Sequence, residues 1–276
     1  MLELEQELGA GRPEQLVLRV DRTDPSKNVV RGFRAFERLL EDNPDLHGRV
    51  GMLALLDPTR QDIPEYAEYL GAIQRTARSV NDHFQTEGWT PIELRIEDNF
   101  LQAVAAYKQY DVLLVNAIFD GLNLVAKEAP LINERNGVLI LSENAGAHEE
   151  LAEWALTVNP FDIAGQAEAL RTALEMPSEE RRQRLEGLRA HVREHDLAEW
   201  VDEAATAFGL PAPGPRALAQ VRTALAVLQR TRAHAGLGEQ WSRLVGDERK
   251  IATLAVQRLT AGRSAYGPWN VDDHRV

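Results

Sequence analysis

The residues with the clearest chemical potential lie in one short stretch, Asp120 to Glu128, which reads DGLNLVAKE. Gly121 allows the backbone to turn tightly and to approach a ligand closely. If a helix begins there, the N–H groups of residues 122–124 lack helical partners and can face an anion. The carboxylates of Asp120 and Glu128 can accept hydrogen bonds from sugar or ribose hydroxyls. An ordinary turn with a solvated acid at each end explains the same spacing.

Two cations, Arg22 and Lys27, form a second group with potential chemistry. Asp24 and Pro25 have the residue types of a helix N-cap and of the first helical position. The spacing therefore predicts Lys27 in the first turn of a helix, where a cation opposes the helix dipole. A positive charge in an unfavourable place indicates an anionic partner, and Arg22 is expected to converge on the same point. The alternative is a pair of solvated side chains at a helix start.

Apolar runs precede both groups, and such runs are typical of buried parallel strands. We expect strands and helices to alternate at least five times, as a doubly wound parallel sheet requires. The fold class predicted is therefore α/β, with ligands at the carboxyl ends of the strands. The expected strands span residues 15–20, 49–56, 92–96, 111–115, 137–141 and 155–158. The expected helices span about 62–84, 99–108, 121–133, 178–194 and 196–208. One further helix is expected to end at about residue 42, and another to begin after residue 162.

Composition narrows the classes of function. The 276 residues carry a formal net charge of -12, which argues against nonspecific binding to nucleic acid or to an anionic membrane. The chain has no cysteine, so it has no disulfide and no thiolate chemistry. No apolar run approaches the roughly 20 residues of a membrane span. The acidic N-terminus lacks the features of a signal peptide, and the cytoplasm is the expected location. No metal-ligand spacing is present, and no metal site is predicted.

The motif DGLNLVAKE resembles the donor-site motif of the trehalose-6-phosphate synthase family, which are retaining glycosyltransferases of the GT-B type, family 20. Leu122 stands where that family usually has methionine. Two further segments share the resemblance: the Arg22…Lys27 pair, and Ser142 to Ala147, which is similar to the family's Ser-x-x-Ala-Gly-Ala. The resemblance runs from residue 15 to about residue 207 and covers only the C-terminal, donor-binding half of such proteins.

This resemblance implies a role for each matching residue. Arg22 and Lys27 would bind the donor diphosphate, Asp120 would orient the sugar hydroxyls, and Arg60 would lie near the acceptor phosphate. The remaining donor-binding positions that it implies are Gly121, Leu122, Asn123, Leu124, Val125 and Glu128, the last on the ribose. It implies neither a covalent nucleophile nor a resident cofactor. His148 follows the third motif directly, and we expect it to be a surface or packing histidine.

The implied reaction transfers glucose from UDP-glucose or GDP-glucose to glucose 6-phosphate with retention, giving trehalose 6-phosphate. One alternative keeps the donor site and changes the substrates: a pseudo-glycosyltransferase that joins a nucleotide-linked cyclitol to an aminocyclitol phosphate. Another is a nucleotide-binding or regulatory module, or a fragment, without activity. The expected partners are a nucleotide-sugar donor, a sugar-phosphate acceptor and a separate N-terminal GT-B half. Without that half, we expect weak nucleotide binding and little turnover. The base, the true acceptor and the oligomeric state stay open.

The chain is expected to divide into five parts. Residues 1–14 would be the remnant of an interdomain connection, and residues 15–208 the nucleotide-sugar-binding domain. Residues 209–215 form a proline-rich linker. Residues 216–262 read as a hairpin of two amphipathic helices of open purpose, and residues 263–276 as a poorly ordered tail.

Overall fold

The computed structural model describes residues 6, 9 and 11–195 of the chain. The chain divides into two compact units, Met1–Glu194 and His195–Val276. The predicted linker, hairpin and tail, the predicted helix 196–208 and most of residues 1–14 lie outside the described residues. The predicted domain boundaries therefore stay predictions, although the first strand begins at Gln15.

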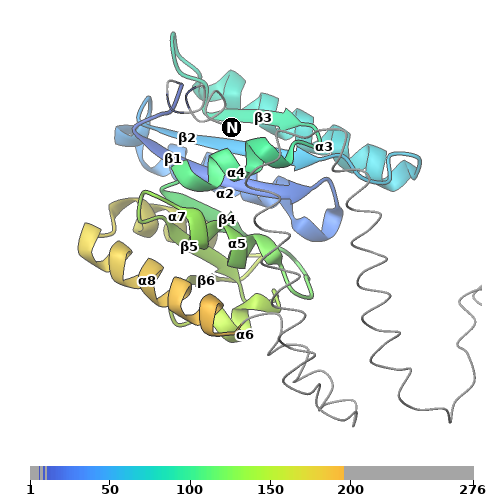
Figure 1. Cartoon of the computed structure of the whole chain (residues 1–276). Coiled ribbons are helices and arrows are strands. Elements are labelled where there is room, and N and C mark those ends of the chain that lie inside the picture. Colours follow the sequence, from blue (N-terminus) through green and yellow to red (C-terminus); the bar gives the residue numbers. More distant parts are fainter. Residues whose placement is uncertain (1–5, 7–8, 10, 196–276) are drawn as a thin grey trace, which may run out of the picture. The chain divides into compact units, whose positions relative to one another are not determined.

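A six-stranded parallel sheet forms the centre of the first unit, in the order β3-β2-β1-β4-β5-β6 (Figure 1). This result confirms the predicted doubly wound α/β fold. The strands are β1 Gln15–Arg22, β2 Val50–Asp57, β3 Ile92–Ile96, β4 Val112–Val115, β5 Val138–Ser142 and β6 Leu156–Val158.

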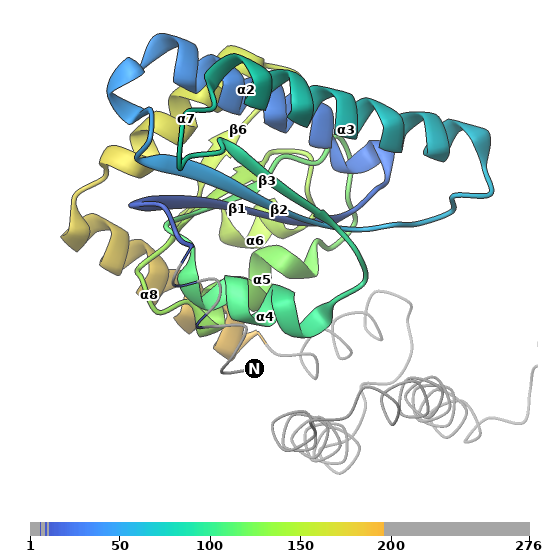
Figure 2. The same ribbon diagram turned by 90° about the horizontal axis from the view of Figure 1, so that it is seen from above.

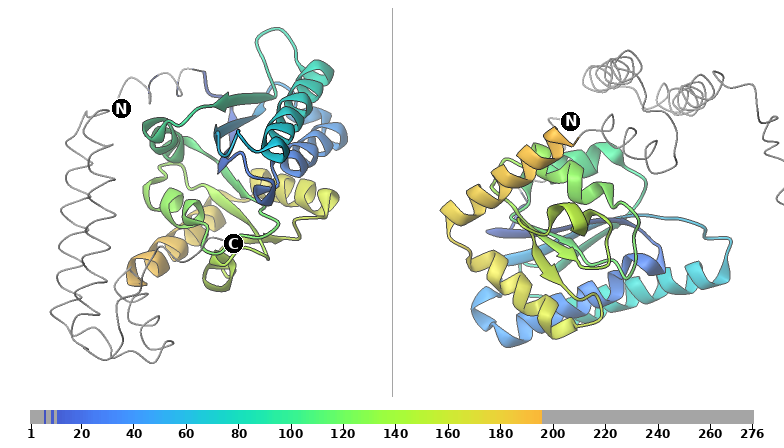
Figure 3. Two further views of the ribbon diagram at one scale, coloured as in Figure 1. Left: turned by 90° about the vertical axis from the view of Figure 1, so that its right-hand side faces the viewer. Right: turned by 90° about the horizontal axis from the view of Figure 1, so that it is seen from below.

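Helices cover both faces of the sheet (Figure 2). One face carries α2 Val29–Asp42, α3 Pro64–Phe84 and α7 Ile163–Glu175, and the other carries α4 Phe100–Gln109, α5 Leu124–Ile132 and α8 Ser178–Glu194. The short elements are α6 Ala147–Leu151 and the 3-10 turns η1 Pro25–Lys27 and η2 Pro44–Leu46. Two further views show the same layers (Figure 3).

The alternation of side chains along the central strands explains their continuous apolar runs. Val112 and Leu114 join the hydrophobic core under α2, α3 and α7. Their neighbours Leu113 and Val115 join the second core, under α4, α5 and α8. A strand buried on both faces has no polar side to show in its sequence.

The strand order reverses between β1 and β4. The first three strands run outward from β1 to one edge, and the last three run outward from β4 to the other. In open α/β sheets the crevice outside the carboxyl ends of the strands at such a reversal is the usual ligand site. Both candidate motifs of the sequence follow these two strands. No helix in the described part of the chain is long and apolar enough to cross a membrane.

Candidate functional site

The loop after β1 has a different shape from the one predicted. Asp24 does act as a cap, since its Oδ1 accepts hydrogen bonds from the Ser26 amide at 2.9 Å and the Ser26 hydroxyl at 2.8 Å. The capped element is the single 3-10 turn η1, which ends at Lys27. Asn28 then adopts the left-handed conformation, with φ of 61°, and α2 begins at Val29. The cap at Asp24 and the first position at Pro25 are therefore as predicted, but the turn that contains Lys27 does not continue into α2, which begins after Asn28.

Lys27 and Asp120, which are 93 positions apart in sequence, meet at the carboxyl ends of β1 and β4. The Lys27 ammonium forms an ion pair and hydrogen bond with Oδ2 of Asp120, and its Nζ lies 4.0 Å from Oδ1 of Asp21. The two loops also touch through the backbone, since the Ile118 amide donates to the Ser26 carbonyl at 2.8 Å. The structure thus brings together Lys27, implied to bind the donor diphosphate, and Asp120, implied to orient the sugar hydroxyls.

The loop after β4 exposes hydrogen-bond donors next to this ion pair. Asn123, left-handed with φ of 50°, caps α5 by accepting from the Ala126 amide at 3.2 Å. Its amide nitrogen donates to Oδ2 of Asp120 at 2.8 Å. Helix α5 begins at Leu124, three residues later than predicted. Within the described residues, the backbone N–H groups of residues 122–125 donate to no other group. These amides are available to an anion at the helix start.

The third motif supports this loop directly. The Gly146 amide donates to the Asp120 carbonyl at 2.8 Å. A Cβ on Gly146 would lie 1.6 Å from the carbonyl oxygen of Gly121, so no side chain fits at this contact. The small residues of Ser142 to Ala147 therefore let two loops touch.

Arg22 and Arg60 lie on the same edge of the sheet. Arg22 is the last residue of β1 and is exposed. Burial acts to raise the pKa of Asp24, but hydrogen bonds from Ser26 and the nearby charge of Arg22 lower that pKa below its usual value. Arg60 donates to the Tyr66 hydroxyl at 2.9 Å, and that hydroxyl donates to Oδ2 of Asp24 at 3.4 Å. Both arginines are thus linked to the η1 loop.

Glu128 lies on α5 and His148 on α6, the helices that follow the second and third motifs. Glu128 is exposed on α5. Burial is the main reason why the pKa of Tyr107 is raised, and the charge of Glu128 adds to it. The His148 ring lies 2.9 Å from the Thr157 hydroxyl, a contact typical of a packing histidine.

Asp21 is a member of the site that the sequence reading missed. Its side chain is 6% exposed and lies 3.0 Å from the guanidinium of Arg19. Burial raises the pKa of Asp21, the charges of Arg19 and Lys27 oppose this, and Asp120 adds to the increase. Arg19 and Asp21 alternate with apolar residues, and that pattern normally indicates the solvent face of a strand. The two charged residues in an apolar strand were therefore a visible signal, but a solvent-facing side of the strand explained them equally well.

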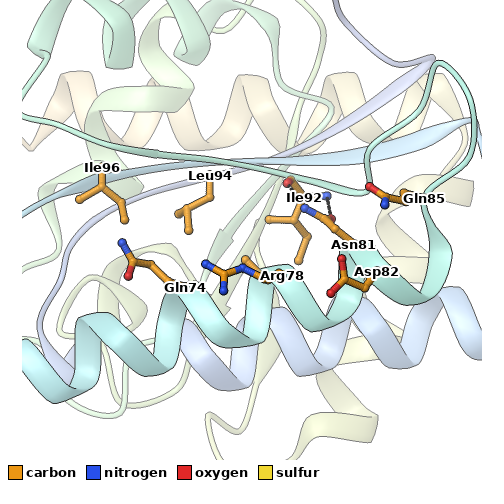
Figure 4. A pocket seen from close by; sticks show the side chains of 9 residues that line it. Gln74, Arg78, Asn81, Asp82, Gln85, Ile92, Leu94 and Ile96 are labelled. Carbon is orange, nitrogen blue, oxygen red and sulfur yellow. Dashed lines mark hydrogen bonds between the residues drawn. The ribbon is translucent and has the colours of Figure 1, made fainter.

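One hollow in the described residues lies away from this site. It measures about 550 Å³ between α3 and the edge strand β3, where Gln74, Arg78 and Asn81 face Ile92 and Leu94 (Figure 4). None of its lining residues was predicted for the site. The described residues also contain no group of three His, Cys, Asp or Glu side chains placed to hold a metal ion. At the Lys27–Asp120 site, the two side chains are 12% and 17% exposed and lie in the loops that follow β1 and β4.

Comparisons with known proteins point to one family. The profile of glycosyltransferase family 20 matches residues 2–208. The chain is 38% identical over 191 residues to a trehalose-6-phosphate synthase of Sodalis glossinidius, covering 67% of this chain and 40% of that protein. It is 37% identical over 194 residues to a glucosylglycerol-phosphate synthase of Pseudomonas anguilliseptica, covering 69% and 26%.

A solved structure gives the same result. The fold matches a UDP-forming alpha,alpha-trehalose-phosphate synthase of Burkholderia xenovorans in complex with glucose-6-phosphate, with a TM-score of 0.68 and 37% identity. The match covers 71% of this chain and 43% of that one. The chain therefore spans less than half the length of the relatives that it matches.

Proposed function

Because this chain belongs to glycosyltransferase family 20, we propose that its α/β unit is the donor-binding half of an enzyme similar to trehalose-6-phosphate synthase. The donor is a nucleotide-sugar, UDP-glucose or GDP-glucose, and the acceptor is glucose 6-phosphate. An N-terminal GT-B half supplies the acceptor domain. The isolated chain binds nucleotide but turns over little, because one half does not position the acceptor against the donor.

The observation that carries this proposal is the ion pair between Lys27 and Asp120 at the strand reversal. The carboxylates of Asp21 and Asp120 hold the ammonium of Lys27, and no described backbone carbonyl accepts from it. A diphosphate can replace a carboxylate as the partner of an ammonium group. The exposed Arg22 and the amides of residues 122–125 then supply further donors to the same anion.

The chemistry follows from where charge develops. As the bond between the anomeric carbon and the diphosphate oxygen breaks, negative charge grows on the leaving diphosphate. Lys27, Arg22 and the amides stabilise that charge, so their contribution is greatest in the transition state. Lys27 in turn releases Asp120, which accepts hydrogen bonds from the sugar hydroxyls, while Glu128 holds the ribose. The acceptor hydroxyl attacks from the same face and passes its proton to the departing phosphate, so configuration is retained.

A second acceptor class has specific support. The chain is about equally similar to a trehalose-6-phosphate synthase and to a glucosylglycerol-phosphate synthase, at 38% and 37% identity. A glycerol phosphate in place of glucose 6-phosphate therefore fits the same donor half. Arg60, which lies on the site's edge and reaches the η1 loop through Tyr66, is the residue that would meet either acceptor's phosphate.

The test is calorimetric titration of the chain with UDP, GDP, UDP-glucose and GDP-glucose. We expect one nucleotide series to bind. Lys27→Ala and Arg22→Ala should each weaken it by roughly 10- to 100-fold, the range of a hydrogen bond to a charged group. Lys108→Ala and Arg38→Ala are matched controls, since their partners Glu134 and Asp42 lie outside the site. Absence of binding at millimolar nucleotide, or equal losses in the controls, would contradict the proposal.

A further inference from the structure

Arg19, in the middle of β1, is completely buried, although its side chain is charged. One terminal nitrogen, Nη2, donates to the carbonyl oxygen of Lys27 and lies 3.0 Å from Oδ2 of Asp21. The other, Nη1, donates to Oδ1 of Asn116 at 2.6 Å. A single guanidinium therefore connects the strand to the η1 loop and to the residue that follows β4.

Helix α2 leaves space for this guanidinium. A Cβ on Gly32 would lie 2.4 Å from Nη1 of Arg19 and 3.3 Å from Nδ2 of Asn116. Any larger residue at position 32 would push the guanidinium away from its partners. The helix thus has a glycine on its inward face where the buried arginine needs room.

The hydrogen bonds continue beyond Arg19 into a buried polar network. Asn116 donates to Oε1 of Gln166 at 2.6 Å. Asn28 donates to the Asn116 carbonyl at 2.9 Å and to the Pro160 carbonyl at 2.7 Å. Asn28, Asn116 and Gln166 are at most 2% exposed. The network connects the residue after η1 to the carboxyl end of β4 and to the first turn of α7, and Arg19 joins it to the Lys27 carbonyl.

This arrangement is costly for a residue with only a packing role. The Nε of Arg19 is buried and has no hydrogen-bond partner among the described residues. Buried ion pairs are often no more stabilising than apolar side chains of similar volume. Two of the three partners of Arg19 are instead the Lys27 carbonyl and Asp21, the carboxylate that faces Lys27.

We propose that Arg19 is a positioning residue for Lys27, which it acts on in two ways. Its bond to the Lys27 carbonyl fixes the backbone from which the ammonium reaches the diphosphate. Its ion pair with Asp21 neutralises a carboxylate that otherwise competes with the diphosphate for Lys27. This role rests on the proposed function, because it acts on nucleotide only through Lys27. Arg19 itself touches no substrate.

The test is a double-mutant cycle with UDP and GDP as probes, titrated into the wild type, Arg19→Met, Lys27→Ala and the double variant. We expect Arg19→Met to lose at least about tenfold in affinity when Lys27 is present, and little or nothing more in the Lys27→Ala background. A purely structural role predicts the same fractional loss in both backgrounds. That result would overturn the inference. Arg19→Lys should recover only part of the affinity. The planar guanidinium of arginine contacts Asn116, the Lys27 carbonyl and Asp21 at once, whereas the single ammonium of lysine cannot.

A second variant keeps the test decisive if Arg19→Met does not fold. Gly32→Ala retains every charge but places a methyl group against Nη1 of Arg19, and we expect the same Lys27-dependent loss of nucleotide affinity. Gly71→Ala in α3 is the matched control, since its methyl group meets only the flexible end of Arg75, at 3.0 Å. Equal effects of the two alanines would contradict the inference.

Amide hydrogen exchange separates this inference from the proposed function. In the wild type the Lys27 amide donates to Asp24 and the Asn28 amide donates to Pro25. We expect Arg19→Met to accelerate exchange at these two amides and to leave α3 unchanged. If the wild type bound neither UDP nor GDP, the proposed function would fall, and the exchange data alone would decide the role of Arg19. Unchanged protection at both amides would refute it.

Discussion

At the amino ends of β1 and β4, three arginines surround one aspartate; at the carboxyl ends, one lysine and one buried arginine share two aspartates. The amino-end cluster consists of Arg12, Arg135 and Arg181 around Asp111, which is 5% exposed. The amino-end cluster has more positive than negative charges, whereas the two cations and two carboxylates at the carboxyl end balance. They differ in what else the cations bind.

The cations at the amino end hold the backbone together. Arg12 donates to the carbonyls of Gln109 at 3.1 Å and Pro13 at 2.8 Å. Arg181 donates to the carbonyls of Asn136 and Asp111, both at 3.0 Å. The Asp111 carboxylate also accepts from the Leu16 amide at 2.8 Å. A ligand could not displace these contacts without opening the fold.

The Lys27 ammonium at the carboxyl end has only carboxylate partners among the described residues, and Arg22 is exposed. An anionic ligand can take over these contacts while the strands stay in place. Cations that bind backbone carbonyls, as at the amino end, therefore stabilise the fold. A cation that binds only carboxylates, as Lys27 does among the described residues, can instead bind an anionic ligand.

Asp111→Asn should give the largest effect. It leaves three guanidiniums without their shared carboxylate, and removing one partner of a buried ion pair costs about 3–5 kcal/mol. We expect the free energy of unfolding in urea to fall by that amount. The UDP affinity of the folded protein should stay within about twofold, since no contact at the carboxyl end changes. A large loss of affinity with unchanged stability would reverse the comparison.

The sequence predicted the strands well for a physical reason. Apolar runs such as Val112–Val115 have few alternatives to a buried strand, and motif residues after strands lie at one edge of a parallel sheet. The position of Lys27 was harder, because the left-handed Asn28 that interrupts the helix leaves no mark in apolar spacing. Arg19 could not be interpreted alone, since its meaning depends on Gly32 and Asn116, which become neighbours only in the fold.

Gly146→Ala should have an intermediate effect and act mainly at the carboxyl end. The backbone φ of Gly146 is −57°, which suits any residue, so the effect is steric. The new methyl group would displace the Gly121 carbonyl and with it the loop that carries Asp120. We expect about 1–3 kcal/mol of destabilisation and a loss of UDP binding, measured by urea unfolding and calorimetry. Gly71→Ala is the control, and matching behaviour of the two variants would refute the steric account.

Asp21→Asn should give the smallest effect, seen as a change in pH dependence. Burial raises the pKa of Asp21 in the folded state. The folded state therefore holds the Asp21 proton more tightly than the unfolded state does. The stability gained in this way is fully present below the unfolded pKa of about 3.9 and is lost as the pH rises through the folded pKa. We expect wild-type stability to decline across that window, and the asparagine variant to lack this component. Urea unfolding at a series of pH values measures it, and identical profiles would contradict the pKa shift.

The most direct measurement of the central claim is amide hydrogen exchange of the wild-type chain with and without saturating UDP or GDP. The account predicts protection of residues 22–28 and 120–126, at the carboxyl ends of β1 and β4. Residues 109–113 and 134–137, at the amino end, should exchange at the same rate in both states. Nucleotide-dependent protection at the amino end, or along β3 and α3, would contradict the assignment of the site.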